Sequence, residues 1–132
     1  MSKKIHCSVL TPERLVYEGD VDAIYAVMYD GERGFLPEHA PMVANLGIGA
    51  MRLHHDGVKT LIEVEGGFVE FSRNRLIVLA EEAMKQEELS EKQLRLELDQ
   101  LDIDEKGASP ERLKKIALLR KKLASRLQVA VR

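Results

Sequence analysis

Residues 31–41, with the sequence GERGFLPEHAP, carry the strongest indication of the fold in this chain. Two glycines three positions apart allow backbone angles that other residues avoid, and two prolines four positions apart fix φ and remove backbone donors. Phe35 and Leu36 lie between them, in a segment that suits neither a regular helix nor an ordinary central strand. So many constrained residues in one stretch predict a loop that shapes a surface.

On both sides of this loop, up to Ala80, the chain has the pattern of short β-strands. Ile5, Cys7 and Val9 alternate with polar residues, as in a half-buried strand, so Cys7 is expected to be buried. The last predicted strand covers residues 76–80. Three dipeptides predict turns: Asp56-Gly57, Gly66-Gly67 and Asn74-Arg75. This spacing predicts an antiparallel β-sandwich or flattened barrel of about eight to ten strands.

After Ala80 the composition changes to Leu, Glu, Lys, Gln and Arg, which favour helices. Ser90 and Gln93 have the spacing of a capping box, and Ser109-Pro110 predicts the start of a second helix. Apolar residues at helical spacing give each helix one apolar face: Leu94, Leu98 and Leu101, then Leu113, Ile116, Ala117, Leu123, Ala124, Leu127 and Val131. Two helices with a short connection predict an antiparallel hairpin.

Together these patterns predict an α+β chain with two domains. A β-sandwich domain is expected over residues 1–84, and a two-helix antiparallel hairpin domain over residues 85–132. Glu81 and Glu82 are expected in a solvated linker just past the last strand.

The two predicted helices carry opposite charges. Residues 81–105 hold ten acidic and three basic residues, a net charge of −7, and residues 108–132 hold one acidic and eight basic residues, a net charge of +7. Helix pairing can explain this split, but exposed pairs contribute only a few tenths of a kcal/mol each. The other explanation is that the second helix also serves an acidic partner when the hairpin opens. Its basic candidates are Arg112, Lys114, Lys115, Arg120, Lys121, Lys122 and Arg126.

The composition of the 132 residues excludes several classes of function. A net charge of −2 and the absence of Trp argue against nucleic-acid binding, and the single Cys7 excludes an internal disulfide. There is no phosphate loop, no catalytic triad and no metal-ligand spacing, so we expect neither an enzyme nor a metal site. The N-terminus is too polar for a secretion signal, and no run approaches about 18 apolar residues. We expect an intracellular protein without direct membrane insertion.

Four features occur in this order: LTPER followed by VYEG near the N-terminus, the loop of residues 31–41, GGFVE with Asn74 downstream, and a helical hairpin ending in RLQV. From Ile5 to Val129 this arrangement resembles the epsilon subunit of bacterial and chloroplast F-type ATP synthases. The resemblance implies a sandwich docked on the gamma subunit and the c-ring in the rotating central stalk. It also implies a peripheral position on the cytoplasmic face of the bacterial plasma membrane.

The same resemblance implies a non-catalytic, regulatory role for the hairpin. It would fold against the sandwich or extend along gamma, where its basic helix meets acidic segments of the catalytic beta and alpha subunits and hinders ATP hydrolysis. Contacts with the rotor are implied for five loop residues: Glu32, Phe35, Leu36, His39 and Pro41. The simpler alternatives are a solvated turn residue at Glu32 and a hydrogen-bonded loop histidine at His39.

Some epsilon subunits bind ATP through an Ile/Leu-Asp-x-x-Arg-Ala motif, from which this chain departs. Ser90 stands in place of the Asp and Gln93 in place of the Arg, so the cationic fork for phosphate is missing. Two cations remain that could contact a phosphate, Arg126 and, one turn before it, Lys122, and they make only a weak site. We expect no cofactor, and ATP to bind weakly or not at all.

A second hypothesis of a different class stays open. The chain would then be a stand-alone β-sandwich binding module whose helical tail forms a dimer through the apolar stripe of the second helix. A homodimer without affinity for gamma would favour this alternative.

Overall fold

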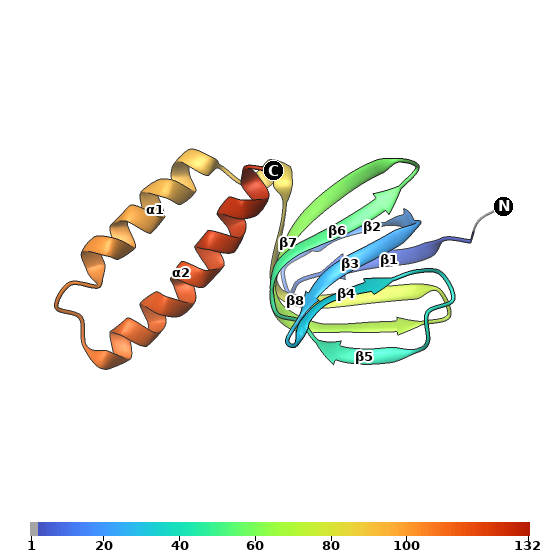
Figure 1. Cartoon of the computed structure of the whole chain (residues 1–132), viewed down its shortest axis with the longest axis horizontal. Coiled ribbons are helices and arrows are strands. Elements are labelled where there is room, and N and C mark those ends of the chain that lie inside the picture. Colours follow the sequence, from blue (N-terminus) through green and yellow to red (C-terminus); the bar gives the residue numbers. More distant parts are fainter. Residues whose placement is uncertain (1–2) are drawn as a thin grey trace.

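Over residues 3–132, which the computed structural model describes, eight strands come first and two long helices last (Figure 1). The strands are β1 (Ile5–Leu10), β2 (Leu15–Val21), β3 (Ala23–Met28), β4 (Gly31–Phe35), β5 (Met42–Asn45), β6 (Ile48–His55), β7 (Val58–Ser72) and β8 (Arg75–Lys85). They are followed by the 3-10 helix η1 (Gln86–Glu88) and by α1 (Glu91–Asp104) and α2 (Pro110–Ala130). The predicted α+β class is confirmed.

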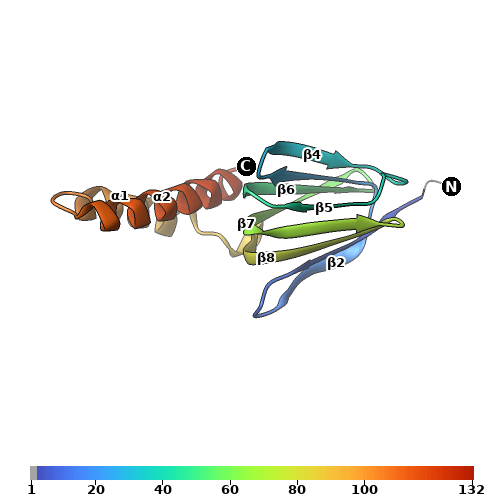
Figure 2. The ribbon, with the colours of Figure 1, turned by 90° about the horizontal axis from the view of Figure 1, so that it is seen from below.

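The strands form one eight-stranded sheet that folds over into two layers. Its order is β2-β1-β8-β7-β6-β3-β4, and β5 pairs with β7. Figure 2 shows β4 and β6 in one layer and β2 and β8 in the other. The predicted sandwich is therefore confirmed. One pairing is not antiparallel: β1 and β8 run parallel, an arrangement that the long connection between them permits.

The long strand β7 connects the two layers. It pairs with β6 over residues 58–65 and with β5 over residues 68–71, while β8 pairs along its other edge. Gly66 and Gly67 lie between these two parts with φ of 71° and 97°. A Cβ on Gly67 would lie 2.0 Å from the carbonyl oxygen of Leu79. The predicted chain reversal at these glycines is therefore wrong: they bend a continuous strand and let β8 approach closely.

The two tight turns between sequential strands lie at or next to their predicted positions. The Asp56-Gly57 hairpin turn is confirmed, with positive φ at both residues. The next turn lies at Arg73 and Asn74, one residue before the predicted position, because these two residues take the left-handed conformation.

Two segments expected outside the sheet are strands. Residues 31–35 form β4, which pairs only with β3 at the edge of the sheet, so its glycines disrupt no second ladder. The loop is confined to residues 36–41. At the other end, β8 continues to Lys85, so Glu81 and Glu82 are strand residues and the linker assignment is wrong. The length of β7 explains this, because it offers Glu82 a pairing partner in Glu65.

The core lies between the two layers of the sandwich. As predicted, Ile5, Cys7 and Val9 are fully buried, and burial raises the pKa of the Cys7 thiol to about 12. The large buried side chains around them include Ile24, Phe35, Met51, Leu53, Phe71 and Leu76.

The hairpin begins where the sequence predicts. Ser90 accepts a hydrogen bond from the backbone of Gln93, and Ser109 accepts one from Arg112, with Pro110 at the first helical position. The helices meet through a small apolar seam: Leu94, Leu101, Ile116 and Leu123. The predicted stripe of α2 is only partly correct. Four members are exposed, because this face points away from α1: Leu113, Ala117, Ala124 and Val131.

Candidate functional site

Two glutamates of β7 are buried under the C-terminal part of α2. Glu63 is 0% exposed and Glu65 is 1% exposed. Strand side chains alternate, so Ile62 and Val64 enter the sandwich core while the two carboxylates point to the other face. That face is covered because α2 packs against β6 and β7 there. The site therefore consists of acidic side chains closed in by a basic helix.

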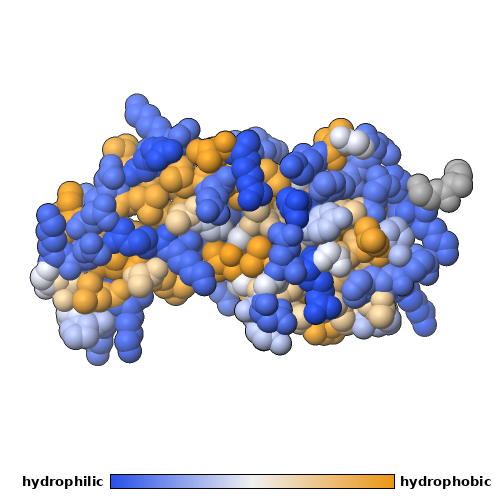
Figure 3. Space-filling view, in the orientation of Figure 1, coloured by the Kyte–Doolittle hydropathy of each residue, from blue (hydrophilic) through white to orange (hydrophobic). Residues whose placement is uncertain are grey.

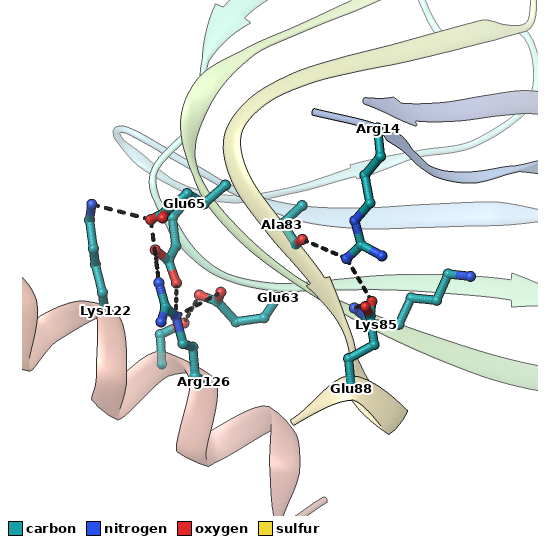
Figure 4. A network of polar contacts seen from close by, with 10 residues as sticks. Arg14, Glu63, Glu65, Ala83, Lys85, Glu88, Lys122 and Arg126 are labelled. Carbon is teal, nitrogen blue, oxygen red and sulfur yellow. Dashed lines mark hydrogen bonds and ion pairs between the residues drawn. The ribbon is translucent and has the colours of Figure 1, made fainter. Parts of the chain in front are cut away.

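Arg126 of α2 reaches both carboxylate oxygens of Glu65. Its Nε donates over 2.5 Å and its Nη2 over 2.8 Å, a bidentate pair (Figure 4). The same Nη2 lies 3.3 Å from Glu82 Oε2 on β8, which also accepts from Lys122 Nζ at 3.5 Å. One arginine thus ties α2 to two neighbouring strands.

Glu63 is bound differently. The Ser125 hydroxyl donates to Glu63 Oε2 over 2.7 Å, whereas Oε1 has no hydrogen-bond partner within residues 3–132 and lies 3.9 Å from Arg126 Nε. We call Glu63, Glu65, Ser125 and Arg126 the carboxylate latch.

The two carboxylates of the latch have opposite pKa shifts. Burial, followed by the neighbouring Glu65 carboxylate, raises the pKa of Glu63 to about 9. Burial also acts to raise the pKa of Glu65, but hydrogen bonding, first from Arg126, outweighs it and lowers that pKa to about 2. At neutral pH, therefore, Glu63 is neutral, Glu65 is charged and Arg126 balances that charge.

The segment between sandwich and hairpin is held by separate polar contacts. Arg14 Nη2 donates to Glu88 Oε1 over 2.8 Å and lies 3.4 Å from the carbonyl oxygen of Ala83 (Figure 4). Gln86 Nε2 donates to the carbonyl oxygens of Val129 and Arg132, at 2.9 and 2.8 Å. Gln86 thereby ties the segment before α1 to the C-terminal end of α2.

The candidate rotor contacts do not all reach the surface. Glu32 is exposed and accepts from Arg52 Nη2 at 2.7 Å, and Leu36 and Pro41 are also exposed. Phe35 is wholly buried and stacked on Phe71, so its side chain belongs to the sandwich core of the isolated chain. As the last residue of β4 it alternates inward, toward the core, and its contact with a partner stays a prediction.

His39 is half-buried and has two neighbours that explain its position. Its ring lies 5.0 Å from Phe35 and 5.4 Å from Phe71, and its Nδ1 is 2.7 Å from the carbonyl oxygen of Ala40. The loop around it is hooked to the β7–β8 turn, because Asn74 exchanges two hydrogen bonds with Glu38, at 2.6 and 2.9 Å. The exposed part of this loop is thus held in one shape.

The basic residues of α2 divide into three groups. Lys122 and Arg126 face the sandwich, and Arg120 reaches Asp102 and Glu105 of the facing helix and its end, at 2.6 and 2.8 Å. The others are exposed and form no ion pair within residues 3–132: Arg112, Lys114, Lys115 and Lys121. Helix pairing through ion pairs therefore uses only Arg120, and it does not account for the whole charge split.

The sequence profile of the ATP synthase delta/epsilon chain β-sandwich domain matches residues 4–86. The chain belongs to this family. An ATP synthase epsilon chain of Halalkalibacterium halodurans is 46% identical over 79 residues, which are 60% of this chain and 59% of the relative. One of Desulforamulus reducens is 34% identical over 112 residues, 85% and 76% of the two chains. This chain thus spans less than two thirds of the length of the first relative.

Two solved structures of low identity share the fold of this delta/epsilon family member. A chain of the Euglena gracilis mitochondrial ATP synthase has a TM-score of 0.85 at 19% identity, covering 98% of this chain and 82% of that one. A chain of the Tetrahymena thermophila mitochondrial ATP synthase has a TM-score of 0.62 at 13% identity, covering 98% of both. Both matches include the hairpin as well as the sandwich. Within residues 3–132, no helix has the length and apolarity to cross a membrane.

The departure from the ATP-binding motif of the family has a structural counterpart. Ser90 caps α1, and the Gln93 side chain donates to Glu97 at 3.3 Å. A cavity of about 270 Å³ between the helices is lined by Arg126, but also by Glu97 and Asp104. Arg126, the arginine that could contact a phosphate, is thus already bound to carboxylates.

Sequence reasoning found Arg126 and Lys122 but missed the residues that they bind. Glu63 and Glu65 alternate with apolar residues, as solvated residues of a half-exposed strand do, so nothing local distinguishes them. Their role depends on a helix about 60 positions later in the chain.

Proposed function

We propose that this chain is a central-stalk, or rotor, subunit of a proton- or ion-translocating F-type ATP synthase. It is not itself an enzyme in this proposal. Residues 1–84 connect the gamma subunit to the c-ring, and residues 85–132 restrain ATP hydrolysis. The family membership and the name of the relatives, ATP synthase epsilon chain, support it. The two structures of similar fold come from assemblies described with a c-ring, which agrees with this place.

The surface offered to gamma and the c-ring consists of the loop of residues 36–41 and the preceding strand β4. Leu36 is 57% exposed although it is a large apolar residue, and Pro41, Glu32 and part of His39 lie on the same segment. Because Asn74 holds this loop, an apolar contact could form without ordering it first. The chain would then sit peripherally at the cytoplasmic face of the bacterial plasma membrane, with no nucleic acid as partner.

The observation that carries the regulatory part is the exposed basic face of α2. Arg112, Lys114, Lys115 and Lys121 form no ion pair within residues 3–132, while the docked hairpin is held by the carboxylate latch together with Lys122 and Gln86. Because these few side chains of α2 and its flanking segment hold the hairpin on the sandwich, it can exchange between docked and extended states. Extended, its basic face would meet acidic segments of the catalytic beta and alpha subunits.

The test is ATP hydrolysis by the matching catalytic complex, with the full chain and with a chain that ends at Glu88. We expect faster hydrolysis after truncation, with assembly intact. A matched variant keeps the hairpin and changes Arg112, Lys114, Lys115 and Lys121 to Gln, and it should reproduce most of the gain. Unchanged hydrolysis in both would leave the sandwich as a coupling piece without an inhibitory arm.

The same proposal includes weak or absent ATP binding. Arg126 already holds Glu65 and Glu82, so a phosphate would have to displace two carboxylates near Glu97 and Asp104. Calorimetric titration of the full chain should therefore give no saturable signal in the sub-millimolar range. Such binding would refute this part while leaving the rotor role intact.

The exposed apolar residues of the hairpin favour the alternative function, a binding module with a dimerising tail. Leu96, Ile103, Leu118 and Leu119 are exposed, and Figure 3 shows apolar patches between the charged ones on the hairpin. Light scattering distinguishes the two hypotheses. A stable homodimer without affinity for gamma would favour the alternative, and a monomer that binds gamma would favour the rotor subunit.

A further inference from the structure

We propose that docking of the hairpin on the sandwich is coupled to the binding of one proton at Glu63, so that alkaline pH releases the hairpin. This inference deepens the proposed regulatory role and rests on it for its biological meaning. The docking itself can be measured without the ATP synthase complex.

The docked state encloses two carboxylates and one guanidinium. Glu63 and Glu65 lie two residues apart on one face of β7, and both are closed off from water. Arg126 forms its short, two-pronged contact with Glu65, whereas the nearest approach to Glu63 is 3.9 Å. One guanidinium therefore neutralises one carboxylate, and the second must be neutral to stay buried.

Glu63 is flanked on its sheet by β8 and β6. On β8, uncharged Met84 lies opposite Glu63, and Glu82 lies opposite Glu65. On β6, the residues opposite are Ala50 and Ile48, with Arg52 and His54 further along the same face; Arg52 is paired with Glu32.

Within residues 3–132, the remaining elements add no second cation at Glu63. From α2, Ser125 donates to Glu63, and Lys122 is bound to Glu82. The η1 segment contributes Glu87 and Glu88, the latter paired with Arg14, and α1 contributes Glu97 and Asp104 beside Arg126.

The opposite pKa shifts of Glu63 and Glu65 set the direction of the pH effect. The pKa of Glu63 is raised by docking from its ordinary 4.5 to about 9, so its contribution is complete below about 4.5 and is lost as pH rises through about 9. Glu65 behaves oppositely, because its lowered pKa makes its contribution fade as pH falls from about 4.5 toward 2. Between about pH 5 and 9, docking takes up one proton and weakens about tenfold per pH unit.

The test follows docking in the isolated full chain by the distance between two spin labels, at Glu81→Cys on β8 and Lys121→Cys on α2, both exposed. The native Cys7 is buried and should stay unlabelled. Urea is set so that about half of the hairpins are docked at about pH 7.5. Raising the pH by about one unit should lower the docked fraction from about one half to about one tenth.

The decisive variant is Glu63→Gln, which keeps the shape of the neutral acid and cannot titrate. Its docking should change less than about twofold over the same pH step. Glu70→Gln, on an exposed residue of the same strand, should behave like the unaltered chain. Equal pH dependence with and without Glu63, or none in the unaltered chain, would overturn the proposal.

A second measurement covers the case in which urea unfolds the sandwich together with the hairpin. Carbon-13 NMR of the Glu63 carboxyl in the docked chain should show a neutral acid throughout the neutral pH range. Titration near the ordinary glutamate value would refute the proton site. If docking depends on pH but hydrolysis in the complex does not respond to the hairpin, the proposed regulatory function fails and the proton coupling stands.

Discussion

Replacing Arg126 with Ala should release the hairpin and leave the sandwich folded. The substitution leaves Glu65 as a buried carboxylate without its bidentate partner. Removing one partner of a buried ion pair costs about 3–5 kcal/mol. The docked variant could instead protonate Glu65, but this costs a similar amount. Neutralising a carboxylate with an ordinary pKa of 4.5 at about pH 7.5 takes about 4 kcal/mol.

The chain can avoid this cost by undocking, since Glu65 then returns to water. We therefore expect the docking equilibrium to fall by at least about 150-fold, the equivalent of about 3 kcal/mol. The assay is the spin-label distance between sandwich and hairpin, and protease cleavage in the segment of residues 86–90 gives an independent readout. The melting of the sandwich should hardly change, because its core does not include Arg126.

Two controls make the reasoning refutable. Arg126→Lys keeps the positive charge but loses the two-pronged guanidinium. Its docking equilibrium constant should therefore lie between those of the unaltered chain and Arg126→Ala. In a double-mutant cycle with Glu65→Gln, the two losses should be far from additive, because both changes remove the same pair. Docking within about threefold of the unaltered chain after Arg126→Ala would show that apolar contacts hold the hairpin and that the ion pair is incidental.

Further predictions concern the sandwich. Gly67→Ala should lower the free energy of unfolding by about 3 kcal/mol or more, because the new Cβ would lie 2.0 Å from a carbonyl oxygen at a residue with φ of 97°. Gly57→Ala is the control: its φ is 78° but the space around it is open, so it should cost about 1 kcal/mol. Chemical denaturation measures both. Asn74→Ala should speed hydrogen exchange of the Glu38 amide about tenfold, since that amide loses its acceptor; an unchanged rate would mean that the loop does not depend on the hook. Cys7 should resist maleimide at neutral pH until the chain unfolds, and rapid labelling of the native chain would contradict its burial.

The exposed basic face changes how the charge split of the hairpin is explained. Only Arg120 joins the two helices by ion pairs, whereas Lys122 and Arg126 join α2 to the sandwich. The remaining basic residues have no acidic neighbour that neutralises them within residues 3–132. The sorted charge is thus used partly for docking and is partly exposed on α2.

Local chemistry fixed the features that were predicted correctly. The Asp56-Gly57 turn and the helix starts at Ser90 and Ser109 depend on a few adjacent residues whose backbone preferences and side-chain caps act within one turn. The alternation of Ile5, Cys7 and Val9 likewise requires only one buried face. Such features can be derived from the chain because their causes lie within it at short range.

The tertiary structure alone decided the bend of β7 and the latch. Gly66 and Gly67 have the composition of a turn, yet the strand continues because β5, β6 and β8 pair along both of its edges. Glu63 and Glu65 have the pattern of solvated residues, and they are buried only because α2 folds back over them. Whether a carboxylate is solvated or enclosed depends on which distant element covers it, and no local preference encodes that contact.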